Sequence, residues 1–453
     1  MFEKRKMQVD FLNGQIFPAL FRFAVPVFFS LIFQQLYNTV DTVIIGHTLG
    51  EKSLAAMGSA SAVYELFLGF TNGMGSGLAI VTARSFGSGK HEQLKKTTAA
   101  ALIIALITSV IVTTVALVSL RPFLAFLKTE EAILPEAYAY VSTIVLFFVV
   151  SLAYNLCSGM MNAIGNSVMP LVFLMISSIS NIGLDMLFIL VFKMGIRGAA
   201  IATVIAQLIS VICCVIYIYK KVQLLIPAKE HFVFDKALYR EMILQGLSNG
   251  LMTSIVNSGT AVLQSGINGL GYLVVAGHVA ARKLFSLFMM FSIAMMQAVN
   301  TFVSQNFGAN QGKRIRKGVK MAYCYNTVLF SCLGVVVYFI APFMVKIISG
   351  SDETVIISNG TRYLRFVVPS MVILGILNST RLALQSIGQK ILPVMSSIIE
   401  LIGKIVFVII FIPRFGYNAV IVCEPVIWVL MDVELLLAFW LNPYIRKSAY
   451  DGD

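Results

Sequence analysis

The chain has 453 residues, of which 58% are hydrophobic and only 12% are charged, and its mean hydropathy is +0.86. No water-soluble fold could bury so much apolar surface, so the composition indicates a polytopic membrane protein. The net charge of +13 fits basic loops that lie against anionic lipid, and it does not indicate nucleic-acid binding.

Apolar runs long enough to cross about 30 Å of hydrocarbon as a helix recur along the whole chain. They predict an all-α integral membrane protein with twelve transmembrane helices, short connections and no soluble domain. Pro18, Pro26 and Pro369 fall inside these helices and mark candidate kinks. The predicted spans are 16–46, 53–82, 97–119, 136–163, 167–192, 197–220, 240–268, 272–304, 317–345, 359–386, 390–413 and 416–441.

Twelve crossings place both termini on one side of the membrane, and most Lys and Arg residues of the connections fall on that side. Because basic residues in short loops stay in the cytoplasm, we expect both termini to be cytoplasmic. The basic start MFEKRK is not followed by a short apolar core with a cleavage site, so we expect the first helix to remain as an anchor. The simplest location is the plasma membrane, here a bacterial inner membrane.

The second half of the sequence repeats features of the first half at a nearly constant offset. The matches are Phe86-Gly87 with Phe307-Gly308, Pro122-Phe123 with Pro342-Phe343, Tyr140 with Tyr363, Asn155 with Asn378, Ile164-Gly165 with Ile387-Gly388, and Pro170 with Pro393. Each half contains an even number of helices, so both have the same topology and should be related by a pseudo-two-fold axis along the membrane normal.

We therefore expect a six-helix N-terminal lobe (1–222), a cytoplasmic linker (223–239) and a six-helix C-terminal lobe (240–453). Parallel repeats of this kind place a substrate site between the halves and work by rocking one half against the other. Since the sequence contains no Gly-x-x-x-x-Gly-Lys-Ser/Thr loop, this architecture favours a secondary transporter over an ATP-driven pump.

Polar side chains gather on single faces of several helices in the N-terminal half. The spacings of three and four residues place Gln34, Tyr37, Asn38 and Asp41 on one face of the first helix, and Ser178, Asn181 and Asp185 on one face of the fifth. Asn155 and Ser158 share a face of the fourth helix, and Thr203 lies on the sixth. These residues could converge on one buried pocket.

Two membrane-buried aspartates suggest a site for coupling ions, because such residues normally mark an ion or substrate path. Burial disfavours a charged carboxylate and a second carboxylate disfavours it further, so an Asp41/Asp185 pair could hold a proton. Alternatively, Asp41, Asp185, Asn181 and Thr203 could form an oxygen cage for Na+. The simpler alternative is that the amides and hydroxyls only join neighbouring helices. No other metal site and no cofactor are expected.

Charged residues also fall inside helices elsewhere in the chain. Glu400 and Lys404 have the spacing of a self-neutralising pair. The basic residues of the second half could instead line a cavity for anionic or zwitterionic substrates, and these residues are Arg282, Lys283, Arg381 and Lys404. Glu424, Asp432 and Glu434 are either their partners or residues at the end of the twelfth helix. Glu65 either faces a cavity and favours cationic substrates or bonds to a neighbouring helix. Gln297 follows a stripe of Phe and Met residues that is typical of either a promiscuous surface or ordinary packing.

The chain resembles the multidrug and toxic compound extrusion (MATE) family from about residue 20 to residue 443. The resemblance rests on the order and spacing of several motifs. They are PVFFSLIFQQLYNTVDTVIIG from Pro26, LAAMG from Leu54, NAIGNSVMP from Asn162, NIGLDMLFI from Asn181, GIRGAAIATVIAQ from Gly195 and SQNFGANQG from Ser304.

This resemblance implies two lobes around a central cavity and export of amphipathic, often cationic compounds driven by an inward H+ or Na+ gradient. It implies that Asp41 and Asp185 are the coupling carboxylates, supported by Tyr37, Asn155, Asn181 and Thr203, and that Pro26 allows the first helix to bend. The sodium-coupled branch carries acids on helices 7 and 10, but here residues 245–269 have none and helix 10 carries Arg381. H+ is therefore favoured over Na+.

The main alternative is a lipid-linked oligosaccharide flippase of related fold, which Arg282, Arg381 and Lys404 would suit. An intramembrane enzyme is disfavoured because nothing around Asp41 and Asp185 suggests hydrolysis. The expected partners are small-molecule drugs or toxic metabolites, H+ or Na+, and membrane lipids. Since one chain contains a complete pathway, we expect a functional monomer.

Overall fold

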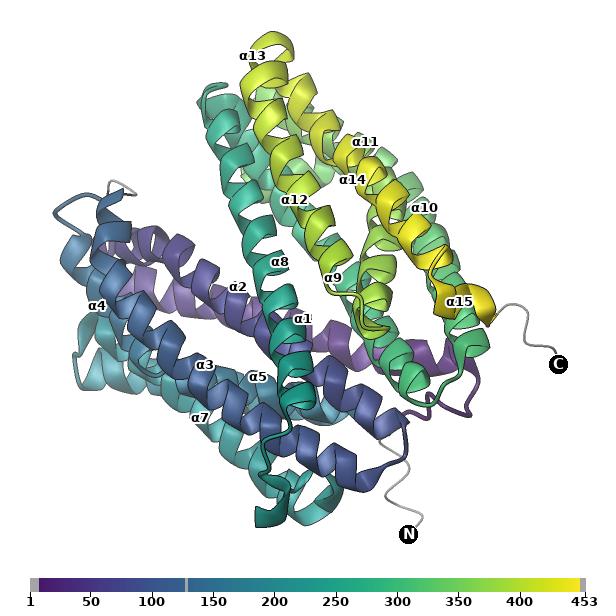
Figure 1. Cartoon of the computed structure of the whole chain (residues 1–453). Helices are drawn as coiled ribbons and strands as arrows, with labels where there is room; N and C mark the ends of the chain where they lie inside the picture. The colour runs from purple at the N-terminus through teal and green to yellow at the C-terminus, as the bar shows by residue number, and fades with distance from the viewer. Residues whose placement is uncertain (1–7, 127–128, 449–453) are drawn as a thin grey trace. The chain divides into compact units, whose positions relative to one another are not determined.

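The computed structural model describes residues 8–126 and 129–448, and every regular element within these ranges is a helix (Figure 1). Each predicted membrane span coincides with a helix or with a helix and its direct continuation. The long apolar runs form helices because a helix satisfies its own backbone hydrogen bonds, which is a requirement in hydrocarbon.

The first half of the chain forms seven helices and one π-helical segment. These are α1 (Ile16–Leu49), α2 (Glu51–Gly87), α3 (His91–Phe126), α4 (Leu134–Leu146), α5 (Phe148–Ala163), α6 (Val168–Asp185), the π-helix η2 (Met186–Val191) and α7 (Gly195–Lys221). The fourth predicted span is α4 and α5 together, which are bent by 51° at Phe147.

Two short 3₁₀ turns, η3 (Gln223–Leu225) and η4 (Lys229–His231), lead into the second half. Its elements are α8 (Lys236–Asn268), α9 (Tyr272–Gly308), α10 (Gly312–Ser349), α11 (Thr354–Ser386), α12 (Ile391–Val406), the π-helix η5 (Phe407–Phe411), α13 (Ile412–Phe415), α14 (Tyr417–Trp440) and α15 (Pro443–Lys447).

Length and hydropathy identify nine membrane-spanning helices in the described part of the chain, or ten with the bent α4–α5 pair. Of the two remaining predicted spans, α8 is less apolar, whereas α14 is strongly apolar but carries three acidic residues. Helix α8 is rich in Ser, Asn and Gly, and α14 carries Glu424, Asp432 and Glu434. Their polar side chains therefore belong inside the protein and not against lipid.

The helices form two compact units. One contains the described residues 8–10 together with Val25–Gly250, and the other contains Phe11–Ala24 together with Leu251 and the residues that follow it. Helices α1 and α8 each run from one unit into the other, next to Pro26 and at Gly250. The lobe boundaries predicted at residues 222 and 240 stay a prediction.

The internal repeat recurs in the backbone of the two units. Four residues with left-handed φ angles in the first half have counterparts in the second half, at the turns between matching helices. The pairs are Gly50 (83°) with Gly271 (95°), Gly89 (71°) with Asn310 (61°), Gly165 (86°) with Gly388 (96°), and Gly195 (61°) with Gly416 (56°). A π-helix also follows both α6 and α12. These matched positions can be used to align the residues of one unit with those of the other.

Within the first unit, α2 lies directly against the N-terminal half of α8. A Cβ atom placed on Gly73 would lie 2.6 Å from the backbone oxygen of Asn249, and one on Gly77 would lie 2.5 Å from that of Gln245. Arg84, nearer the end of α2, donates a hydrogen bond to Glu241 at 2.8 Å. Glycine permits this close contact because it has no side chain to separate the two backbones.

Candidate functional site

A polar cavity of about 300 Å³ lies inside the first unit. Helix α1 contributes a face on which polar residues recur every three or four positions, and the other sides come from α2, α4, α5, α6 and α7. The lining residues are Gln34, Tyr37, Asn38, Asp41, Thr42, Met57, Tyr64, Glu65, Leu68, Asn72, Tyr140, Ile144, Ser151, Tyr154, Asn155, Leu174, Ser177, Ser178, Thr203 and Gln207.

Asp41 and Asp185 are both buried, with 8% and 0% of the residue surface exposed. Asp41 lines the cavity, whereas Asp185 does not reach its surface and lies close enough to interact electrostatically with Asp41. Within the described residues, Oδ1 of Asp41 and both carboxyl oxygens of Asp185 have no hydrogen-bond partner. Two adjacent carboxyl groups without a basic partner are costly in their charged forms. This pair is therefore suited to holding a proton or a cation.

Asn181 lies one turn before Asp185 on α6 and is fully buried. Neither its amide oxygen nor its amide nitrogen has a hydrogen-bond partner among the residues that the structure describes. Helix α6 ends at Asp185, where the π-helix η2 begins. Such π-helical insertions often occur at functional sites because they change the register of side chains.

Hydrogen bonds fix several walls of the cavity. The hydroxyl of Tyr37 donates to Oγ1 of Thr203 at 3.4 Å, which joins α1 to α7. The amide of Asn155 donates to Oδ1 of Asn72 at 2.6 Å, and the hydroxyl of Ser151 donates to Oε1 of Gln207 at 2.5 Å. These contacts hold polar groups in place around the cavity, as a binding site requires.

The structure brings most of the predicted N-terminal residues to this cavity. Gln34, Asn38, Ser178 and Glu65 all belong to its lining, as do Tyr37, Asn155 and Thr203. Ser158 lies on α5 outside the lining.

The side chain of Glu65 is exposed to the cavity and makes no ion pair with any described residue. The lining contains two acidic residues and no Lys or Arg. The cavity therefore has the electrostatic character that favours cations.

Sequence reasoning missed a set of tyrosines and amides on neighbouring helices. Tyr64, Tyr140, Tyr154, Asn72 and Gln207 line the cavity. The match of Tyr140 with Tyr363 in the repeat and the position of Gln207 one turn after Thr203 were signals that could have indicated two of them. The others could not be placed without knowing which helices are neighbours.

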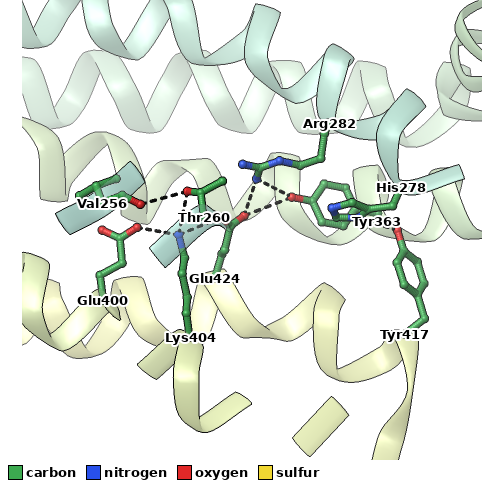
Figure 2. A network of polar contacts seen from close by, with 9 residues as sticks. All are labelled: Val256, Thr260, His278, Arg282, Tyr363, Glu400, Lys404, Tyr417 and Glu424. Carbon is green, nitrogen blue, oxygen red and sulfur yellow. Dashed lines mark hydrogen bonds and ion pairs between the residues drawn. The ribbon is translucent and has the colours of Figure 1, made fainter. Parts of the chain in front are cut away.

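A second buried polar cluster lies in the second unit (Figure 2). Nζ of Lys404 lies 2.8 Å from Oε1 of Glu400 and 3.6 Å from Oε1 of Glu424. Arg282 contacts the other carboxyl oxygen of Glu424 at 2.7 Å and donates to the hydroxyl of Tyr363 at 3.1 Å. The spacing of Glu400 and Lys404 predicts their pairing, and the structure shows this pair.

Two further residues of the second unit, Arg381 and His278, also have polar partners. Nε of Arg381 donates to Ser396 at 3.0 Å, and its Nη2 lies 3.9 Å from Glu400. His278 shares a hydrogen bond with Tyr417 at 3.1 Å, which makes it a contact between helices. Gln297 is half-buried on α9. The basic side chains therefore neutralise internal acids, as the pairing interpretation predicts.

Comparison with known proteins identifies one family along most of the chain. The family model MatE matches residues 26–187 and 250–410. The "Probable multidrug resistance protein YpnP" of Bacillus subtilis is 25% identical over 360 residues, which cover 79% of this chain and 80% of that protein. The "Multidrug export protein MepA" of Staphylococcus saprophyticus is 20% identical over 445 residues, covering 98% and 97% of the two chains.

Solved structures share the fold over nearly the whole chain. A crystal structure of MATE in the bent conformation aligns with a TM-score of 0.88 at 19% identity, covering 97% of this chain and 99% of that one. An outward-facing multidrug resistance MATE family transporter aligns with a TM-score of 0.88 at 20% identity, covering 98% and 99%. A transporter from Pyrococcus furiosus, described as having a binding pocket of reverse polarity, aligns with a TM-score of 0.85 at 19% identity, covering 95% and 98%.

Proposed function

The chain belongs to the MatE family of membrane transporters, and from that premise we propose that it is a secondary active multidrug exporter. It exchanges amphipathic, often cationic organic compounds against H+ by alternating access between two lobes. The names of its relatives, a probable multidrug resistance protein and a multidrug export protein, support this substrate class.

One observation carries the choice of coupling site, namely the two buried and unpaired carboxyl groups beside the polar cavity. Asp41 faces the cavity that receives the substrate, and Asp185 lies behind it. Because the two groups interact, a change of charge at Asp185 affects Asp41. Protonation of this pair therefore changes the electrostatic attraction between the cavity and a cationic substrate.

The proposed cycle uses this connection in a fixed order. A proton that enters from outside binds to the carboxyl pair and lowers its negative charge by one unit. The cavity then attracts a cationic substrate less strongly, and the substrate leaves to the outside. For net export, the proton must bind the inward- and outward-facing states with different affinities. Tyr37, Asn155, Asn181 and Thr203 position the carboxyl groups and supply hydrogen bonds that change with their charge.

Na+ is the alternative coupling ion at the same residues. Asp41, Asp185, Asn181 and Thr203 offer carboxylate, amide and hydroxyl oxygens, which are the ligands of hard cations. The absence of hydrogen-bond partners for Asn181 in the described part of the chain suits either ion. We favour H+ because two neighbouring carboxyl groups buried from solvent readily share a proton.

The membrane arrangement follows from the same proposal. The protein lies in the plasma membrane with both termini in the cytoplasm, as the distribution of basic residues predicts. Pro26 allows α1 to bend during the cycle, and one chain transports as a monomer. We favour the exporter over the flippase alternative because Arg282, Arg381 and Lys404 contact acidic residues, which offset their positive charges.

Transport by proteoliposomes tests this function. Ethidium movement would be measured for the wild type and for Asp185→Asn under separately imposed H+ and Na+ gradients. We expect the H+ gradient to drive export by the wild type and the variant to lose roughly tenfold or more, because its amide cannot take up a proton. Unchanged export by Asp185→Asn would remove this residue from coupling, and no export under either gradient would contradict the exporter.

A further inference from the structure

Several residues of the charged cluster in the second unit correspond, in the internal repeat, to residues that line or adjoin the cavity of the first unit. Helices α6 and α12 both carry proline as their third residue, Pro170 and Pro393. Both are regular α-helices from there to a following π-helix, so residues can be matched by counting from the proline. The matches are Ser177 with Glu400 and Asn181 with Lys404.

Two further residues, Glu424 and His278, match through the glycines at the start of their helices. Counting from Gly195 and Gly416 matches Thr203 with Glu424, and counting from Gly50 and Gly271 matches Met57 with His278. Tyr140 matches Tyr363 within the repeat. Of the first-unit residues in these pairs, Asn181 lies next to the cavity and the others, Met57, Tyr140, Ser177 and Thr203, line it.

In the second unit, three of these positions hold Glu400, Lys404 and Glu424, whose side chains form ion pairs. The side chain of Lys404 is only 2% exposed, and its stem lies against Gly259 of α8. Figure 2 shows its ammonium group between the carboxylates of Glu400 and Glu424, with Oγ1 of Thr260 at 3.4 Å. A small cation bound between two carboxylates and a hydroxyl group would have similar partners.

The charge balance of this cluster depends on Lys404. Arg282 neutralises Glu424 through its other carboxyl oxygen. Arg381 approaches Glu400 only to 3.9 Å, and its charge also acts on Asp432 and Glu434. Removing the ammonium group would therefore leave a buried carboxylate without a close cationic partner, which is strongly unfavourable.

We propose that the ammonium group of Lys404 is a tethered cation that occupies, in the second unit, the counterpart of the first unit's ion site. The second unit thus carries a cation site that the protein itself keeps filled, and ion coupling is confined to the first unit. The statement on coupling rests on the proposed function, whereas the occupancy of the second site by Lys404 does not.

Chemical rescue of Lys404→Ala tests the occupancy. The substitution removes the ammonium group and leaves space for a small alkylammonium ion. Thermal unfolding of the purified full-length protein would be followed by tryptophan fluorescence. Both tryptophans lie on α14, and Trp428 is one turn after Glu424. We expect a lowered midpoint that ethylammonium restores in large part, with no comparable shift for the wild type. If the variant folds poorly, the proposal predicts folded protein when it is purified in ethylammonium.

Two further variants separate charge from volume. Lys404→Met removes the charge but fills the space, so ethylammonium should not restore its midpoint. Lys283→Ala removes an exposed lysine from α9 and should behave as the wild type. The proposal is overturned if ethylammonium stabilises Lys404→Ala no more than the wild type, or if it stabilises Lys404→Met equally well. Because the readout is stability and not transport, a failure of the exporter assignment would not change these results.

Discussion

At the residue scale, the buried acids of the two units have different surroundings. Glu400 and Glu424 contact basic side chains at 2.7–2.8 Å. Asp41 and Asp185 have each other and uncharged groups instead, although burial of a charge without a partner is costly. A protein that served only to span the membrane would gain stability by replacing them. Their presence is explained if a proton or cation binds there during the transport cycle.

Glu65 provides a test of substrate charge recognition at this scale. Its carboxylate lines the cavity and has no ion pair in the described part of the chain. We expect Glu65→Gln to raise the KM for ethidium several-fold, since it removes a favourable Coulomb interaction, and to leave the KM for an uncharged dye unchanged. Transport by proteoliposomes under one H+ gradient would measure both values.

The matched control is Glu51→Gln, which changes an exposed acid at the start of the same helix. It should alter neither KM. An equal effect of Glu65→Gln on charged and uncharged dyes would show that this residue supports the shape of the cavity and does not recognise charge.

At the element scale, the contact between α2 and α8 depends on two glycines. A methyl group at Gly77 would lie 2.5 Å from the backbone oxygen of Gln245, so the two helices would have to separate. We expect Gly77→Ala to destabilise the folded protein by about 1–3 kcal/mol, the usual cost of overpacking. Denaturant unfolding in detergent would measure this change.

Gly58→Ala on the same helix is the control, because a Cβ atom there meets no atom of the described residues within 4 Å. This variant should be as stable as the wild type or slightly more stable, since alanine favours the helix. Equal stability of Gly77→Ala and Gly58→Ala would contradict the close helix contact.

Helix α1 offers a second test at this scale. It passes from one unit to the other next to Pro26, which removes one backbone hydrogen bond inside the helix. We expect Pro26→Ala to slow export several-fold while the unfolding midpoint stays the same or rises, because the restored hydrogen bond resists bending. Export and thermal unfolding would be measured on the same preparation.

Pro18→Ala serves as its control. Pro18 is in the first turn of α1, where a backbone N–H group has no partner within the helix in any case. Its replacement should change neither quantity. Normal export by Pro26→Ala would show that the cycle does not require a bend at this proline.

At the scale of the whole molecule, hydropathy and the internal repeat predicted the helical architecture well. Each of the twelve apolar runs is helical in the described part of the chain, because the membrane permits few other structures. Nine of these runs, or ten with the bent α4–α5 pair, also have the length and hydropathy of a membrane span. The face formed by Tyr37 and Asp41 was also predictable, since spacing along one helix fixes which residues lie together. The bend at Phe147 and the π-helix after Asp185 were not predicted, because they depend on tertiary packing.

Contacts between buried residues on different helices were harder to predict from the sequence than the polar faces of single helices. The pairing of Glu400 with Lys404 follows from their spacing, but the contact of Arg282 with Glu424 joins α9 to α14 and depends on which helices are neighbours. The same is true of Tyr64 and Tyr154 in the cavity lining. Sequence patterns predict the faces of helices, whereas the neighbours of each face come from the three-dimensional packing.

The central claim is that substrate and proton are linked through Asp41 and Asp185. Measuring proton release from the purified protein in weakly buffered solution, as tetraphenylphosphonium binds, tests it most directly. We expect the wild type to release protons on binding, and we expect Asp41→Asn and Asp185→Asn to release markedly fewer while still binding the cation. Binding without proton release by the wild type, or undiminished release by both variants, would contradict it.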